Sequence, residues 1–75
     1  MEELTNKDRR LIAEHLSEYI DTLKKPMKED ALKRVMRWAE GYTFEEIASE
    51  ESVTKQAVSQ QVRRIVKNIN NWRNT

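Results

Sequence analysis

Apolar residues recur at steps of three and four along most of this chain, and polar or charged residues fill the positions between them. This spacing gives an α-helix one buried face. The chain has one glycine and one proline, which leaves little of the chemistry that β-turns need. We predict an all-α fold: a single domain, residues 1–75, with four helices that include a helix-turn-helix and end in an extended last helix.

The first helix is predicted over residues 5–24, where Thr5 and Asp8 form a capping signal at its start. Its apolar stripe consists of Leu11, Ile12, Leu16, Tyr19, Ile20 and Leu23. This stripe is long for a helix that only covers a small helix-turn-helix. We therefore expect part of it to pack against a second copy of the chain.

Pro26 separates the first helix from the second, because proline lacks an amide hydrogen and biases the residue before it away from the helix. The second helix is predicted over residues 27–40, with Gly41 as a left-handed C-cap. Its apolar face consists of Ala31, Leu32, Val35, Met36, Trp38 and Ala39. Met36 and Trp38 could be imagined in a ligand pocket, but no convergent polar groups accompany them, so we predict core packing.

Two capping signals follow at close spacing. Thr43 and Glu46 form a capping box for a short helix that starts at Phe44, and Thr54 offers a second N-cap hydroxyl. A new apolar period then runs to about Trp72. Two helices joined by so tight a turn must cross steeply, and we predict a helix-turn-helix. Its core residues are Ile47, Ala48, Val53, Val58 and Val62.

Three short segments carry a family resemblance. They are Glu40-Gly41-Tyr42-Thr43, Glu45-Glu46-Ile47-Ala48 and Val53-Thr54-Lys55-Gln56. Together they resemble the helix-turn-helix in the fourth domain of primary-type sigma factors, which reads the minus-35 element, and its relatives in small bacterial and phage regulators. The resemblance covers about the last half of the chain, and it implies that residues 27–67 form a DNA-binding core.

The chain departs from that family at two positions. Glu51 stands where the family usually has a buried leucine, and Ser52 stands where it usually has a glycine. A serine in the left-handed conformation costs on the order of 1 kcal/mol relative to glycine. The geometry of the turn is therefore the part of the motif that the resemblance constrains least.

The distribution of charge supports an approach to nucleic acid, although the net charge is only +1. Residues 54–75 contain five basic residues and no acidic one, whereas residues 40–51 contain five acidic residues and no basic one. A uniformly positive helix suits an approach to phosphates. The plainer reading is a solvated helix face, but the charge run coincides with the motif, so we favour DNA.

The side chains opposite the apolar row of the last helix are predicted to contact DNA. They are Thr54, Lys55, Gln56, Ser59, Gln60, Arg63, Arg64 and Lys67. The resemblance gives Lys55, Gln56 and Gln60 the positions at which the family reads bases. Thr54 and Ser59 suit phosphate oxygens, while Arg64 and Lys67 add attraction that is independent of sequence.

The second half of the last helix continues an apolar seam through Ile69 and Trp72, beyond the reach of the small motif. Either the N-terminal helix folds back onto it, or the same helix of a partner chain covers it. Without such packing, the asparagines around it would fray the last turn. The residues that we assign to dimerisation are Leu16, Tyr19, Ile20, Leu23, Ile69 and Trp72.

No residue pattern indicates catalysis. The chain has no cysteine and one histidine, His15, so we predict no enzyme activity, no cofactor and no metal site. No apolar run approaches the ~20 residues that cross a bilayer, which makes a cytoplasmic protein the expectation.

The sequence therefore predicts a transcription regulator, a repressor or an activator, that reads double-stranded DNA as a homodimer. The alternative is a module of the same fold that binds a repressor or RNA polymerase without reading DNA. Glu51, the acidic short helix and the low net charge favour that alternative.

Overall fold

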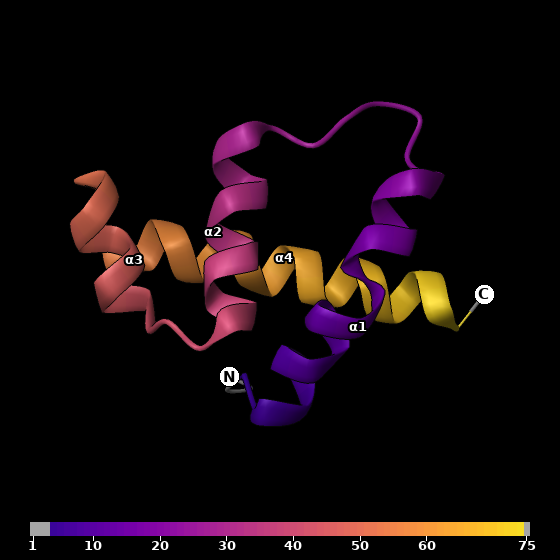
Figure 1. Cartoon of the computed structure of the whole chain (residues 1–75), viewed down its shortest axis with the longest axis horizontal. Helices are drawn as coiled ribbons and strands as arrows, with labels where there is room; N and C mark the ends of the chain where they lie inside the picture. Colours follow the sequence, from indigo (N-terminus) through magenta and orange to yellow (C-terminus); the bar gives the residue numbers. More distant parts are fainter. Residues whose placement is uncertain (1–3, 75) are drawn as a thin grey trace.

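The computed structural model describes residues 4–74, and these form four α-helices with no strand among them. The helices are α1 (Asn6–Thr22), α2 (Glu29–Glu40), α3 (Phe44–Glu51) and α4 (Lys55–Arg73). Figure 1 shows their order along the chain. The predicted all-α fold with four helices is confirmed. Residues 1–3 and 75 of the predicted domain lie outside the described residues.

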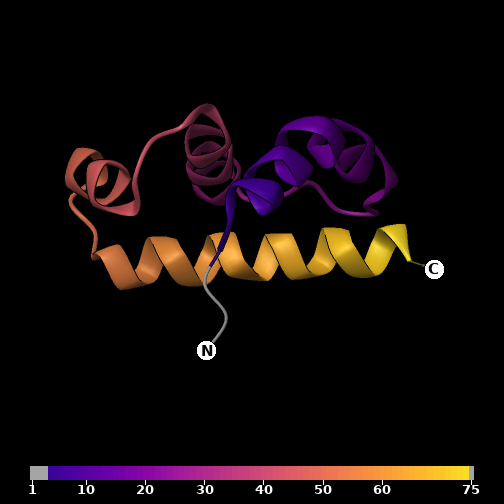
Figure 2. The ribbon, with the colours of Figure 1, turned by 90° about the horizontal axis from the view of Figure 1, so that it is seen from below.

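The long helix α4 forms one side of the molecule, and the other three helices lie together on its opposite side (Figure 2). Along α4, α3 lies over the N-terminal end, α2 over the middle and α1 over the C-terminal part (Figures 1 and 2). The described residues span 34 × 26 × 21 Å. One helix therefore serves as the common packing partner of the other three.

Side-chain caps define where three of the helices begin. The Asp8 amide donates to Thr5 Oγ1 and the Thr5 amide donates to Asp8 Oδ2, so both halves of the capping box at α1 are formed. Thr43 and Glu46 make the same reciprocal pair at α3. Each box satisfies amide donors that a helix start leaves without partners. The predicted capping signals are confirmed.

Two predicted helix bounds need correction. The first helix ends at Thr22 instead of residue 24, because Leu23 already has extended backbone angles. The second begins at Glu29 instead of residue 27, and its cap residue, Lys28, is also extended and makes no side-chain cap bond. Two acidic residues, Glu29 and Asp30, open α2, where negative charge interacts well with the helix dipole.

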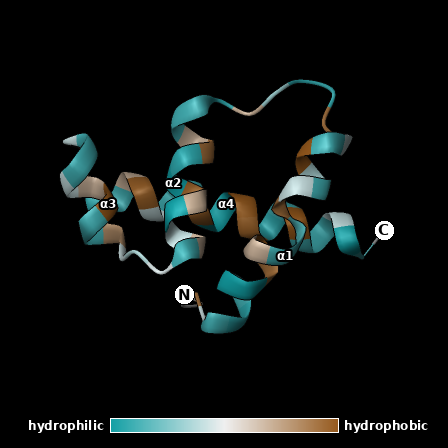
Figure 3. Cartoon of the chain, in the orientation of Figure 1, coloured by the Kyte–Doolittle hydropathy of each residue, from teal (hydrophilic) through white to brown (hydrophobic). Residues whose placement is uncertain are grey.

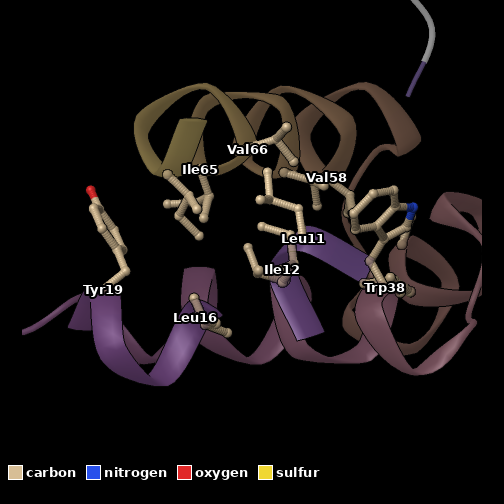
Figure 4. Packing of buried hydrophobic residues seen from close by; sticks show 13 residues of the cluster. Leu11, Ile12, Leu16, Tyr19, Trp38, Val58, Ile65 and Val66 are labelled. Carbon is tan, nitrogen blue, oxygen red and sulfur yellow. The ribbon is translucent and has the colours of Figure 1, made fainter. Parts of the chain in front are cut away.

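The core is built from the apolar faces of all four helices, which alternate with hydrophilic faces along each ribbon in Figure 3. Leu11 and Tyr19 of α1 point toward α4, with Trp38 of α2 at the other end of the layer from Tyr19 (Figure 4). The buried apolar residues are Leu11, Ile12, Leu16, Tyr19, Val35, Trp38, Ile47, Ala48, Val58, Val62, Ile65, Val66 and Ile69.

The N-terminal helix covers the second half of α4. Ile69 is fully buried in this single chain, and the rings of Tyr19 and Trp72 meet edge to face with centroids 5.7 Å apart. Of the two arrangements left open by the sequence, the N-terminal helix folds back onto the apolar seam of α4. No partner chain is needed to cover that seam. The packing also explains why α4 stays helical to Arg73 despite its asparagines.

The assignment of residues to a dimer interface changes accordingly. Leu16, Tyr19 and Ile69 belong to the core of the single chain, so their side chains offer no free surface to a second copy. The other residues of that set are only half-buried at the edge of this core. They are Ile20, Leu23 and Trp72.

Met36 and Trp38 have different environments. Trp38 is 4% exposed and packs in the core, as predicted, whereas Met36 is 47% exposed, so the prediction of core packing is wrong for Met36. Two positions apart on a helix, the two side chains point in directions roughly 200° apart. Met36 instead lines a shallow apolar hollow between α1 and α2, of about 430 Å³, together with Ile20 and Leu32.

Candidate nucleic-acid interface

A three-residue turn, residues 52–54, joins α3 to α4. Ser52 has φ 55° and ψ 37°, the left-handed conformation, and the Val53 amide donates to the Ala48 carbonyl at 3.1 Å. This bond closes the end of α3 in the manner of a glycine-capped helix. Thr54 then caps α4, because its hydroxyl accepts from the Ala57 amide at 3.1 Å. The structure thus contains the predicted helix-turn-helix geometry.

The crossing of α3 and α4 is closely packed. Ile47, Val58 and Val62 are fully buried, Ala48 is 5% exposed, and Val53 in the turn is half-buried. Four of the five residues predicted for the core of the motif are therefore buried, and Val53 packs against them at the edge. The small side chain of Ala48 lets the two helix backbones approach each other.

The side chains predicted to contact DNA all lie on α4 or at its cap, and most are exposed. Ser59 and Arg63 are half-buried, and the exposed members are Thr54, Lys55, Gln56, Gln60, Arg64 and Lys67. Ser59 Oγ donates to the Gln56 carbonyl at 3.0 Å, and the Thr54 hydroxyl is engaged in capping. Gln56 and Gln60 are one helical turn apart, and their amide groups therefore face the same side of the helix.

Lys55 forms an ion pair with Glu45 of α3, with Nζ and Oε1 3.2 Å apart. Both side chains are well exposed, 62% and 76% respectively. A pair this exposed contributes little to stability, because water screens it and both side chains lose conformational freedom. Lys55 can therefore exchange this carboxylate for another anion at small cost.

Sequence reasoning missed a buried polar cluster that ties α2, α3 and α4 together. Arg34, which is 9% exposed, donates from Nε to Glu51 Oε1 at 3.2 Å and from Nη1 to Gln61 Oε1. The only signal in the sequence was Glu51 at a position where the resembled family has a buried leucine. Glu51 is thus explained by a structural ion pair, and it no longer favours the alternative of a protein-interaction module.

Sequence reasoning also assigned no role to Arg9 of α1. Arg9 is half-buried, and its guanidinium carbon lies 5.0 Å from the centre of the Trp38 ring. Its Nε is buried and has no hydrogen-bond partner among the described residues. Arg9 lines a hollow of about 450 Å³ to which Lys55 and Arg63 also contribute.

Residues 4–74 contain no group of three or more histidine, cysteine, aspartate or glutamate side chains placed to hold a metal ion. Within the same residues, no helix has the length and apolar character to cross a membrane. Comparisons of the chain with models of protein families, with curated proteins and with solved structures found no match. The resemblance to sigma factors therefore stays a prediction.

Proposed function

We propose that this protein is a transcription regulator that binds double-stranded DNA sequence-specifically, and that it acts in the cytoplasm as a binding protein and not as an enzyme. The observation that carries the proposal is the joint geometry of α3, the tight turn and the first half of α4. That half of α4 has a buried apolar side and an exposed polar side without acidic residues. A helix that enters the major groove needs both properties.

In the proposed complex, α4 lies in the major groove with its N-terminal turns toward the base edges, and α3 crosses the backbone. Gln56 and Gln60 are suited to paired hydrogen bonds with adenine, and Lys55 to donation toward guanine or phosphate. Arg64 and Lys67 are exposed further along the same helix and add attraction to the backbone.

We further propose that the protein acts as a homodimer, because one small DNA-binding domain gives little sequence specificity. The recognition helices of two such domains would reach successive major grooves about 34 Å apart. With part of the predicted interface buried in the chain, the half-buried Ile20, Leu23 and Trp72 remain as the residues for this contact. Sedimentation at micromolar concentration, with and without duplex, measures the dimer, and a monomer under both conditions would contradict it.

The decisive experiment is selection from a random duplex library, with the bound pool sequenced. An inverted repeat with half-site centres about one helical turn apart is expected for a dimer, and a single asymmetric site for a monomer. Binding should weaken steeply with salt and with Lys55→Gln. Lys33→Gln, the same change at an exposed lysine of α2, is the matched control. No enrichment would refute the proposal.

One observation favours a second candidate function. The apolar hollow between α1 and α2 leaves Met36 and Leu32 accessible on a face that α4 does not occupy. A module of this fold could use that face to bind a repressor or RNA polymerase without reading DNA. Such a module would not bind duplex DNA with an affinity that falls steeply with salt. Its affinity for its protein partner would not depend on Lys55→Gln or Gln60→Ala.

A further inference from the structure

A basic hollow lies beside the proposed reading surface, where three helices converge. The first turn of α1, the start of α3 and the first half of α4 all contribute to it, and its volume is about 450 Å³. Its charged side chains are Arg9, Lys55, Arg63 and Glu45. Because Glu45 is already paired with Lys55, no carboxylate among the described lining residues is left to offset the charge of Arg9.

Two aromatic side chains, Trp38 and Phe44, line the hollow. Trp38, which is 4% exposed, stacks on Phe44 with ring centroids 6.1 Å apart and planes inclined by 14°. The Arg9 guanidinium lies against this tryptophan. An arginine that rests on an aromatic ring keeps its charge and loses less freedom when it binds an anion, because its position is already restricted.

Arg9 also has unused capacity to bind. The ion pairs formed among the described residues do not include it, and its buried Nε has no acceptor there. A buried donor without a partner is unfavourable unless a ligand or water satisfies it. The planar fork of a guanidinium matches the oxygens of a phosphate better than those of most other anions.

The position of the hollow indicates the source of the phosphate. In a helix-turn-helix, the start of the first helix lies at the DNA backbone while the second helix enters the groove. Here Thr43 and Phe44, at the start of α3, line the same hollow as Lys55 and Arg63 of α4. In the complex proposed above, a backbone strand that flanks α4 therefore passes the opening of the hollow.

We infer that Arg9, from outside the helix-turn-helix, binds a phosphate of the DNA backbone in this hollow. The inference rests on the DNA-binding function proposed above. The inferred contact makes α1 part of the DNA interface. The helix that packs against α4 would then also fix the position of α4 on the duplex. Such a contact positions the protein without reading sequence.

The test compares Arg9→Met, which keeps a long apolar stem on Trp38, with Arg9→Lys, which keeps the charge. Arg10→Met is the matched control, since Arg10 is the exposed neighbour on the same helix. Each variant is titrated with the selected duplex and a scrambled duplex across a salt series. The slope of log K against log salt is negative, and Arg9→Met is expected to reduce its magnitude by about 0.9. The same variant is expected to lower affinity by roughly five- to tenfold at about 0.1 M salt, equally for both duplexes.

Arg9→Lys should retain most of the slope, and Arg10→Met should change it much less. A slope for Arg9→Met equal to that of wild type or of Arg10→Met would overturn the inference and leave the proposed function intact. Failure of the wild-type protein to bind any duplex would overturn both. Should Arg9→Met not fold, the Arg9 Nε–H signal of the wild-type protein gives the answer by NMR: a shift that saturates with duplex supports the contact, and an unmoved signal refutes it.

Discussion

At its N-terminal end, α4 meets α3 across a three-residue turn, and Arg34 links both helices to α2 through Glu51 and Gln61. At its C-terminal end, α4 meets α1 through apolar and aromatic side chains, with Ile69 fully buried and Trp72 against Tyr19. The first end combines a polar exposed face with a polar buried cluster. The second end is held by apolar packing. The N-terminal half of α4 is thus the part that we propose reads DNA, and its C-terminal half is the part that fixes α4 to the rest of the fold.

The largest effect is expected where the buried charge of the first end loses its partner. Arg34→Met removes the cation and leaves Glu51 uncompensated, with a side chain only 14% exposed. We expect a loss of roughly 3 to 5 kcal/mol in the free energy of unfolding. Urea denaturation followed by circular dichroism measures this loss.

The double variant Arg34→Met with Glu51→Leu should regain most of that loss, because apolar side chains of similar volume can replace a buried ion pair. Arg37→Met is the matched single change. Its partner is Glu50, and the two side chains are 30% and 45% exposed, so it should cost about 1 kcal/mol or less. Equal losses in the free energy of unfolding for Arg34→Met and Arg37→Met would show that burial does not make the Arg34–Glu51 pair more important for stability than the exposed pair.

At the other end of α4, the sharpest test is Ile69→Ala. Ile69 is fully buried between α4 and the rest of the core, and removing its side chain should cost about 3 kcal/mol in stability. Asn68→Ala, at an exposed neighbouring position, should change stability by no more than about 0.5 kcal/mol. The same denaturation series measures both variants.

Ile69→Ala also separates anchoring from reading. Below the unfolding transition, where the variant is still folded, its preference among duplexes should equal that of wild type. A loss of stability under about 1 kcal/mol would mean that α1 does not anchor this part of α4. A changed base preference would mean that the two ends of α4 are not separate in function.

The reading end is tested by Gln60→Ala. Gln60 is exposed on the first half of α4, so we expect no loss of stability but a loss of roughly 1 to 3 kcal/mol in binding at one base pair of the selected site. Lys67→Ala should instead weaken binding to all duplexes alike. Affinities for every single-base variant of the site, measured for both proteins, distinguish the two patterns. A uniform loss for Gln60→Ala would contradict base reading by this residue.

How far the sequence predicts the structure also differs between the two ends. The starts of α3 and α4 follow from Thr43, Glu46 and Thr54, because a cap is a contact between residues three apart in the chain. The burial of Ile47 and Val58 follows from helical spacing. Local patterns of this kind need no knowledge of the rest of the fold.

What the sequence left open depends on contacts between distant residues. The seam at Ile69 predicted a covering surface but not whether α1 of the same chain supplies it. The partnership of Arg34 with Glu51 and the stacking of Arg9 on Trp38 join different helices, and no periodicity marks them. For that reason the sequence analysis assigned no role to Arg9 and interpreted Glu51 as a sign of protein binding.

The smallest expected effect concerns the turn that separates the two helices of the motif. Ser52 is in the left-handed conformation, which glycine adopts without the steric cost of a Cβ atom. Ser52→Gly should therefore raise the free energy of unfolding by about 1 kcal/mol. Ser49→Gly, in the exposed part of α3, is the control of opposite sign, because glycine inside a helix costs up to about 1 kcal/mol. If both variants lose stability, the left-handed conformation of Ser52 does not carry a strain that glycine would relieve.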